Sequence, residues 1–118
     1  MITSIIPKLP FVNKQETIDF YVGQLGFLMM ADYGEYFIVN VGSVELHLFS
    51  YENLDPRKSD FMVYVRIDKD IEAFYEKLKM TDVTIHPNGK LEEKPWGQTE
   101  FSILDPSGTL LTFGQTKN

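Results

Sequence analysis

Apolar and polar positions along the chain follow two periods in turn, and the order of those periods repeats. Residues 4–12 are mostly apolar, which predicts a strand. Asn13 is the expected N-cap of a helix and Gly26 its expected stop. Between them, the i, i+3, i+4, i+7 spacing of one helix face occurs in Ile18, Tyr21, Val22 and Leu25.

The second half of the chain repeats this order. Residues 61–67 alternate as a strand does, and Asp68 or Asp70 is the expected cap of a second helix. This helix has the same spacing, in Ile71, Phe74, Tyr75 and Leu78. Three strands are expected after each helix, over residues 27–32, 36–41 and 44–50 and then over residues 83–86, 98–104 and 110–115.

The sequence therefore predicts an α+β fold of paired βαβββ modules. We expect a single domain over residues 1–118, with module one at about 1–52 and module two at about 60–118. The turn formers within residues 51–60 make that stretch the linker. One helix covers only one face of a sheet, so the other face is left for solvent, a ligand or a partner chain. Two curved sheets of this kind would form a cup of mixed sheet.

Charge narrows the range of partners. The chain has 11 basic and 17 acidic residues, a formal net charge of −6. Residues 15–56 contain seven of the acidic residues and no lysine or arginine. Nucleic-acid binding needs a basic surface and is disfavoured. Two interpretations remain, a solvated acidic surface and an acidic site that attracts a cationic ligand.

Cysteine is absent, which excludes disulfides and thiolate chemistry. No apolar run approaches the roughly 20 residues of a membrane span. The first residues lack the basic and apolar regions of a signal peptide, and Lys8 and Pro10 interrupt the apolar stretch. The expected location is cytoplasmic.

Residues 94–115 predict a hairpin with a distinctive turn and a single tryptophan. Asp105-Pro106-Ser107-Gly108 has proline at the second turn position and a glycine free to adopt positive φ. Trp96, the only tryptophan, lies at the start of this hairpin. Its large flat ring could stack on a heteroaromatic ligand, or it could fill a structural gap beside Pro95.

Motifs over essentially the whole chain resemble the vicinal oxygen chelate superfamily, which includes glyoxalase I, extradiol dioxygenases, and fosfomycin- and bleomycin-resistance proteins. The strongest similarity is to the bleomycin-binding branch. It rests on the order and spacing of Ile6-Pro7-Lys8-Leu9-Pro10, Phe20-Tyr21, Leu25-Gly26-Phe27, Pro95-Trp96-Gly97, Glu100-Phe101 and Asp105-Pro106-x-Gly108.

Enzymes of that superfamily bind a divalent metal through four strand positions. The resemblance places these at Ile6, Glu45, Phe61 or Met62, and Thr112. Among them only Glu45 is a good ligand, whereas a protein-bound divalent cation needs several converging N or O ligands. We therefore expect no catalytic metal, no other cofactor and no enzymatic activity.

The resemblance also implies a ligand site. Trp96 and Tyr36 correspond to the two sides of an aromatic clamp, and Glu35 and Glu45 would supply negative potential. Further expected contacts are His47, Phe49, Gln98 and Thr112. A partly buried histidine bonded to a neighbour is the other interpretation of His47.

The implied protein is a homodimer with ligand grooves at the subunit interface, and the resemblance allows exchange of the N-terminal strand. Its expected function is non-catalytic sequestration of a bleomycin-like antibiotic or a similar cationic, planar-aromatic small molecule. Two alternatives stay open. One is a metal-dependent lyase or isomerase of the glyoxalase type, and the other is a binder of another small metabolite.

Overall fold

The computed structural model describes residues 1–117. Its first half contains one α-helix, one π-helix and four strands in the predicted βαβββ order. The segments are β1 (Lys8–Phe11), α1 (Lys14–Ile18), the π-helix η1 (Asp19–Gln24), β2 (Leu28–Asp32), β3 (Tyr36–Val41) and β4 (Val44–Ser50). The single helix expected before Gly26 is thus divided into α1 and η1.

The second half begins with a short 3₁₀ helix and repeats the order. It comprises η2 (Pro56–Lys58), β5 (Met62–Ile67), α2 (Ile71–Lys79), β6 (Thr84–Ile85), β7 (Glu92–Glu93), β8 (Gln98–Leu104) and β9 (Leu110–Thr116). The strand β7 was not predicted. It pairs with β8 through only two residues, too short a stretch for an alternating pattern to be recognised.

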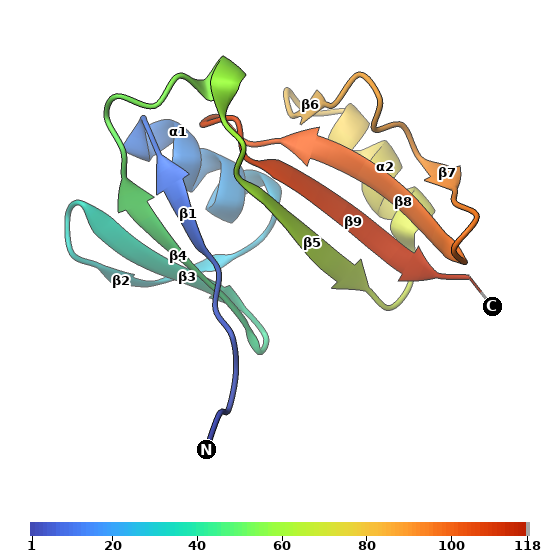
Figure 1. The fold of residues 1–118 in the computed structure, drawn as a ribbon, viewed down its shortest axis with the longest axis horizontal. Helices are drawn as coiled ribbons and strands as arrows, with labels where there is room; N and C mark the ends of the chain where they lie inside the picture. Colours follow the sequence, from blue (N-terminus) through green and yellow to red (C-terminus); the bar gives the residue numbers. More distant parts are fainter. Residues whose placement is uncertain (118) are drawn as a thin grey trace.

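The two sheets have equivalent topologies. The strand order is β1-β4-β3-β2 in the first and β5-β9-β8-β6 in the second, with β7 paired to β8. In each sheet the first strand runs parallel to the last strand of its half, β1 to β4 and β5 to β9. Figure 1 shows α1 and α2 behind the two sheets, on the same side of the molecule. In the described residues, the opposite faces of both sheets carry no helix.

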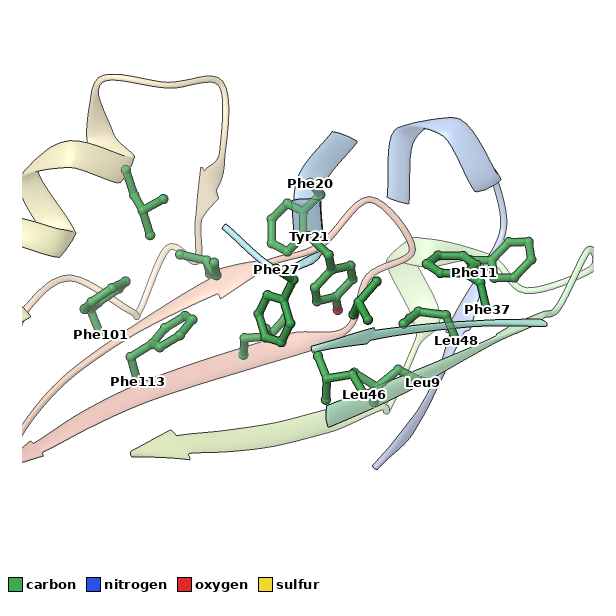
Figure 2. Close-up of a cluster of buried hydrophobic side chains, with 14 of the residues drawn as sticks. Leu9, Phe11, Phe20, Tyr21, Phe27, Phe37, Leu46, Leu48, Phe101 and Phe113 are labelled. Atoms are coloured by element: carbon green, nitrogen blue, oxygen red, sulfur yellow. The ribbon is translucent and has the colours of Figure 1, made fainter. Parts of the chain in front are cut away.

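The core lies between the sheets and their helices. Phe37 and Leu48, on neighbouring strands, are fully buried on the covered face of the first sheet. In the second sheet Phe101 and Phe113 stack with ring centroids 5.1 Å apart, and Phe74 of α2 packs edge-on against Phe113. Phe37, Leu48, Phe101 and Phe113 belong to one cluster of buried residues (Figure 2), and the partly buried Phe74 packs against it. The alternation of buried and exposed positions assigns each strand a covered and an uncovered face.

The two helix starts differ. Asn13 caps α1 as predicted, since its Oδ1 accepts a hydrogen bond of 2.9 Å from the Glu16 amide. For α2, one of the two predicted residues does occupy the N-cap position, but its side chain does not cap the helix. Asp70 occupies the N-cap position with a φ of 64° and makes no side-chain capping bond. The Ile71 amide instead donates to Oε1 of Gln115, 3.0 Å away on β9.

The N-terminal strand is shorter than predicted. Residues 4–7 lie outside β1, and the chain before Lys8 extends away from the sheet (Figure 1). Ile2 and Ile5 are 90% and 91% exposed, so no described residue covers these apolar side chains. An exposed apolar arm is the consequence.

The Asp105–Gly108 turn connects the two halves. The Tyr21 hydroxyl donates to Asp105 Oδ2 at 2.6 Å, and the Val12 amide donates to Ser107 Oγ at 3.0 Å. Gly108 has the predicted positive φ, 85°. A Cβ at Gly108 would also lie 2.0 Å from the carbonyl oxygen of Pro56, so the turn needs glycine for its close approach as well.

Candidate functional site

Two groups of polar and aromatic side chains lie on the uncovered sheet faces. On the first sheet, Glu45, His47 and Phe49 alternate along β4 with the buried Leu46 and Leu48. Strand periodicity places all three on the face opposite the core. Together with Tyr36 of the adjacent β3 they form the first group of candidate residues.

A chain of hydrogen bonds joins three members of this group. The Tyr36 hydroxyl lies 2.6 Å from His47 Nδ1, and His47 Nε2 lies 2.6 Å from Glu45 Oε2. The two rings meet edge to face at 5.4 Å. When Tyr36 donates to Nδ1, the imidazole donates from Nε2 to the carboxylate. Both imidazole nitrogens are thereby engaged, so His47 is a bonded and partly buried histidine that also forms part of this face.

The other expected residues of the first sheet lie around this chain of bonds. Phe49 packs against Tyr51 and Phe61, with ring centroids 6.3 Å and 6.2 Å away. Glu35 lies in the exposed β2–β3 connection, and its backbone carbonyl accepts a bond from the Ser50 amide. The face therefore combines aromatic area with carboxylates at its edge.

On the second sheet, Trp96 extends from a tight turn before β8. The turn is closed by a bond of 3.1 Å from the Gly97 amide to the Lys94 carbonyl, and Gly97 has a φ of 81°. The Trp96 side chain is 64% exposed, yet its Nε1 donates a 2.9 Å hydrogen bond to Glu100 Oε2. An exposed ring with a tethered edge presents its face to solvent, as a stacking residue must.

Glu100 is the polar centre of this second group. It is only 7% exposed, and its Oε2 also accepts a 2.8 Å bond from the Tyr64 hydroxyl. Burial, together with the hydrogen bond to the Glu100 carboxylate, raises the pKa of Tyr64 above its ordinary value. Glu100 and Tyr64 were not predicted as site residues.

Gly114 makes room for Tyr64. It is paired with Glu100 on β8, and a Cβ at this position would lie 1.7 Å from the Tyr64 hydroxyl oxygen. The sequence did contain a signal for this network. Residues 98–104 alternate, which places Glu100 on the polar face with Gln98 and Ser102. The alternation could not show that the Tyr64 hydroxyl and the Trp96 indole both donate to the same oxygen of Glu100.

The two remaining candidates on the second sheet are also bonded. Gln98 accepts a 3.0 Å bond from Arg66 Nη1 and donates a 3.2 Å bond to Thr116 Oγ1. The hydroxyls of Thr112 and Ser102 lie 2.8 Å apart. Trp96 and Thr112 both line a cavity of about 200 Å³. Its lining residues are Asn88, Gly89, Lys90, Lys94, Trp96, Glu100, Phe101, Ser102 and Thr112.

The candidate residues thus fall into two groups within one chain, the first around His47 and the second around Glu100. No hydrogen bond or aromatic contact within residues 1–117 joins the two groups. A larger cavity, of about 470 Å³, lies on the covered side, between apolar residues such as Leu46 and Phe113. It contains none of the expected site residues.

The residues at the superfamily's metal positions do not fit a metal centre. Ile6 and Phe61 have no ligating atom, and Met62 has only a soft thioether sulfur, which does not suit a hard divalent ion. The Thr112 hydroxyl is bonded to Ser102. Glu45 is bonded to His47. In the described part of the chain, no three His, Cys, Asp or Glu side chains lie close enough together to bind an ion. Also in residues 1–117, no helix is long and apolar enough to cross a membrane.

The fold and the site together define a class, paired βαβββ proteins whose uncovered sheet faces carry aromatic and polar side chains. The family model described as Glyoxalase/Bleomycin resistance protein/Dioxygenase superfamily matches residues 11–113. The chain belongs to this superfamily. The α+β fold of paired modules that the sequence predicted is confirmed.

Similar proteins narrow the position within the superfamily. The bleomycin resistance protein of Klebsiella pneumoniae is 31% identical over 116 residues, which cover 94% of this chain and 90% of the relative. A crystal structure of a bleomycin resistance determinant encoded on the transposon Tn5 superposes with a TM-score of 0.84 at 30% identity, covering 99% of this chain and 100% of that one. A bleomycin-binding protein crystallised with bleomycin gives 0.82 at 30% identity, covering 98% and 100%.

Proposed function

We propose that this protein is a non-catalytic binding protein that sequesters bleomycin or a similar cationic, planar-aromatic small molecule. The observation that carries the proposal is the exposed Trp96 ring, tethered at its edge and placed beside a cavity of about 200 Å³. Similarity over nearly the whole chain to proteins named for bleomycin resistance and bleomycin binding supports the same ligand class.

Charge favours a cationic ligand. The net charge is −6, and Glu35 and Glu45 lie at or near the uncovered face of the first sheet. Basic residues do occur beside Trp96, but two of them are paired. Lys94 is bonded to Glu92, and Lys117 to Glu93 at 2.8 Å. The acidic excess raises the local concentration of a positively charged molecule.

We also propose that the protein is a homodimer. The first group, around His47, and the second group, around Glu100, lie on different sheets, and among residues 1–117 of one chain no hydrogen bond joins them. A second copy that faces its first sheet toward the second sheet of its partner would place Tyr36 opposite Trp96 as two sides of a clamp. The exposed apolar side chains of Ile2 and Ile5 support exchange of the N-terminal arm in such a dimer.

Titration with bleomycin tests the binding function directly. We expect quenching of the single tryptophan and, by calorimetry, saturable heat with a Kd of about 1 μM or lower, about −8 kcal/mol. Trp96→Ala should weaken binding at least about tenfold, because stacking on an aromatic face is worth roughly 1–3 kcal/mol. Met80→Ala, at an exposed apolar residue that follows α2, is the matched control and should bind as the wild type does.

The same titration separates sequestration from turnover. Mass spectrometry of bleomycin released after prolonged incubation should find it chemically unchanged. Absence of heat and quenching at high micromolar bleomycin would refute the proposed ligand and leave another small metabolite as the candidate. Sequestration requires protein and ligand in one compartment, and we propose the cytoplasm.

A further inference from the structure

The Trp96 side chain is hydrogen-bonded to Glu100, a residue outside the proposed Tyr36–Trp96 clamp. An exposed tryptophan on a turn is free to rotate about its side-chain torsions. Here Nε1 of the indole is bonded to Glu100 Oε2 at 2.9 Å, which fixes the ring edge and leaves the face exposed. A ring fixed before binding loses less conformational entropy when a ligand stacks on it.

Glu100 can fix the indole because it is itself held. Its oxygen accepts a second bond, of 2.8 Å, from Tyr64, and the side chain is 7% exposed. Tyr64 in turn lies over Gly114, and the Arg66 guanidinium lies 5.5 Å from the Tyr64 ring centroid. The support for Trp96 therefore comes from three adjacent strands, β5, β9 and β8.

We propose that Glu100 is a positioning residue that holds Trp96 as a preformed stacking face for a planar aromatic ring. This inference rests on the binding function proposed above. Glu100 acts through the indole, with Tyr64 as its anchor. A carboxylate bonded to an N–H and an O–H forms two charge-assisted hydrogen bonds, stronger than bonds between neutral groups.

The first experiment uses the free protein, so that it does not depend on any ligand. Trp96 is the only tryptophan, and its time-resolved fluorescence anisotropy and acrylamide quenching report the mobility of this one ring. Glu100→Leu should lower the residual anisotropy and raise the quenching constant about twofold. Glu100→Gln retains an acceptor oxygen and should behave as the wild type does. Unchanged anisotropy in folded Glu100→Leu would overturn the proposal.

If Glu100→Leu does not fold, as judged by circular dichroism, Tyr64→Phe provides the same readout. It removes the anchor of Glu100 and leaves the carboxylate in place. We expect the indole in Tyr64→Phe to be more mobile than in the wild type, but less mobile than a Trp96 ring that has lost its acceptor. A Trp96 ring as immobile as in the wild type would contradict the proposed role.

The second experiment is a double-mutant cycle measured by calorimetry with bleomycin. Glu100→Leu should weaken binding about tenfold in the wild-type background, and Glu100→Gln should recover most of the loss. In a Trp96→Phe background, which has no N–H to tether, Glu100→Leu should change affinity less than about twofold. An equal loss in both backgrounds would mean that Glu100 contacts the ligand directly, and would overturn the positioning role.

The two proposals fail separately. If the wild type does not bind bleomycin, the proposed function is wrong, and the anisotropy of the free variants still decides whether Glu100 positions Trp96.

Discussion

Gly114 is required by the hydroxyl group of Tyr64. A methyl group at this position would lie 1.7 Å from that oxygen and 2.5 Å from Cζ of the ring. Tyr64 is partly exposed and can swing away, but it would then lose its bond to Glu100. We expect Gly114→Ala to lower the free energy of unfolding by about 1.5–3 kcal/mol, the cost of a lost bond to a charged group. Urea denaturation measures this change.

The control is Gly23, where an added Cβ meets no atom within 4 Å. This glycine lies in η1 and has no positive φ. Alanine there should raise the free energy of unfolding by about 0.5–1 kcal/mol, since glycine has more freedom to lose on folding. Stabilisation by both substitutions would show that Tyr64 moves without consequence.

Single residues of the site were predictable to different degrees. A partly buried His47 bonded to a neighbour was foreseen as one of two interpretations. Strand alternation places its side chain on the face opposite to that of Leu46 and Leu48. Glu100 and Tyr64 were not foreseen. Their bond joins two strands separated by β9, and no spacing along the chain specifies it.

At the scale of elements, α2 depends on a residue from β9. The Ile71 amide donates to Gln115 Oε1 at 3.0 Å, so a sheet residue replaces the usual N-cap side chain. Gln115→Leu should lower the free energy of unfolding by about 0.5–2 kcal/mol, the range found for lost N-caps. Faster hydrogen exchange at the Ile71 amide should accompany the loss.

Asp70, unlike Gln115, occupies the N-cap position of α2 without bonding the helix through its side chain. It has a φ of 64° and no side-chain capping bond, so its side chain contributes strain without a cap. Asp70→Gly should therefore leave stability unchanged or raise it by up to about 1 kcal/mol, as glycine adopts this backbone freely. A larger loss in Asp70→Gly than in Gln115→Leu would contradict this account of the helix start.

Local patterns predicted the long helices and strands because, in each of them, buried apolar residues recur at a regular spacing. The i, i+3, i+4, i+7 spacing located both helices, and alternation located β5, β8 and β9. The three strands expected after the first helix correspond to β2, β3 and β4. Among the short or irregular elements, β6 was expected within residues 83–86, whereas β7 and the π-helix η1 were missed. The residues of η1 keep an apolar face, so the pattern does not distinguish the wider π turns from an α-helix.

At the scale of the molecule, one buried pair joins the two halves. The Tyr21 hydroxyl donates to Asp105 at 2.6 Å, and the other carboxylate oxygen accepts bonds from the Ser107 and Thr109 amides. The sequence predicted Tyr21 on a helix face and Asp105 in a turn, and both predictions were correct. That the two meet is a tertiary fact across 84 residues, which neither local pattern contains.

Removing the Tyr21 hydroxyl tests this connection. Tyr21→Phe leaves a buried carboxylate oxygen without its donor, and should lower the free energy of unfolding by about 1–3 kcal/mol. Tyr75→Phe is the matched control, because the Tyr75 ring packs on Phe101 and no hydrogen bond of its hydroxyl occurs in residues 1–117. It should cost less than about 0.5 kcal/mol. Equal losses would show that the Tyr21–Asp105 bond contributes nothing.

The pH dependence of stability reveals the cost of burying Asp105. Burial raises the pKa of this carboxyl above its ordinary value, although the Tyr21 hydroxyl and backbone amides oppose the shift. Between the unfolded and the folded pKa, the folded protein binds more protons than the unfolded chain, so this group's contribution to stability falls as pH rises. Each unit of difference is worth about 1.4 kcal/mol.

Asp105→Asn isolates that contribution, because it retains hydrogen-bonding atoms and removes the titration. Subtracting the free energy of unfolding of the variant from that of the wild type cancels the other carboxylates. The difference should decrease from about pH 4, near the ordinary aspartate pKa, toward pH 7. Urea denaturation at several pH values measures it. A difference that increases with pH would mean that the hydrogen bonds of Asp105 outweigh its burial, and that the folded pKa is lowered instead.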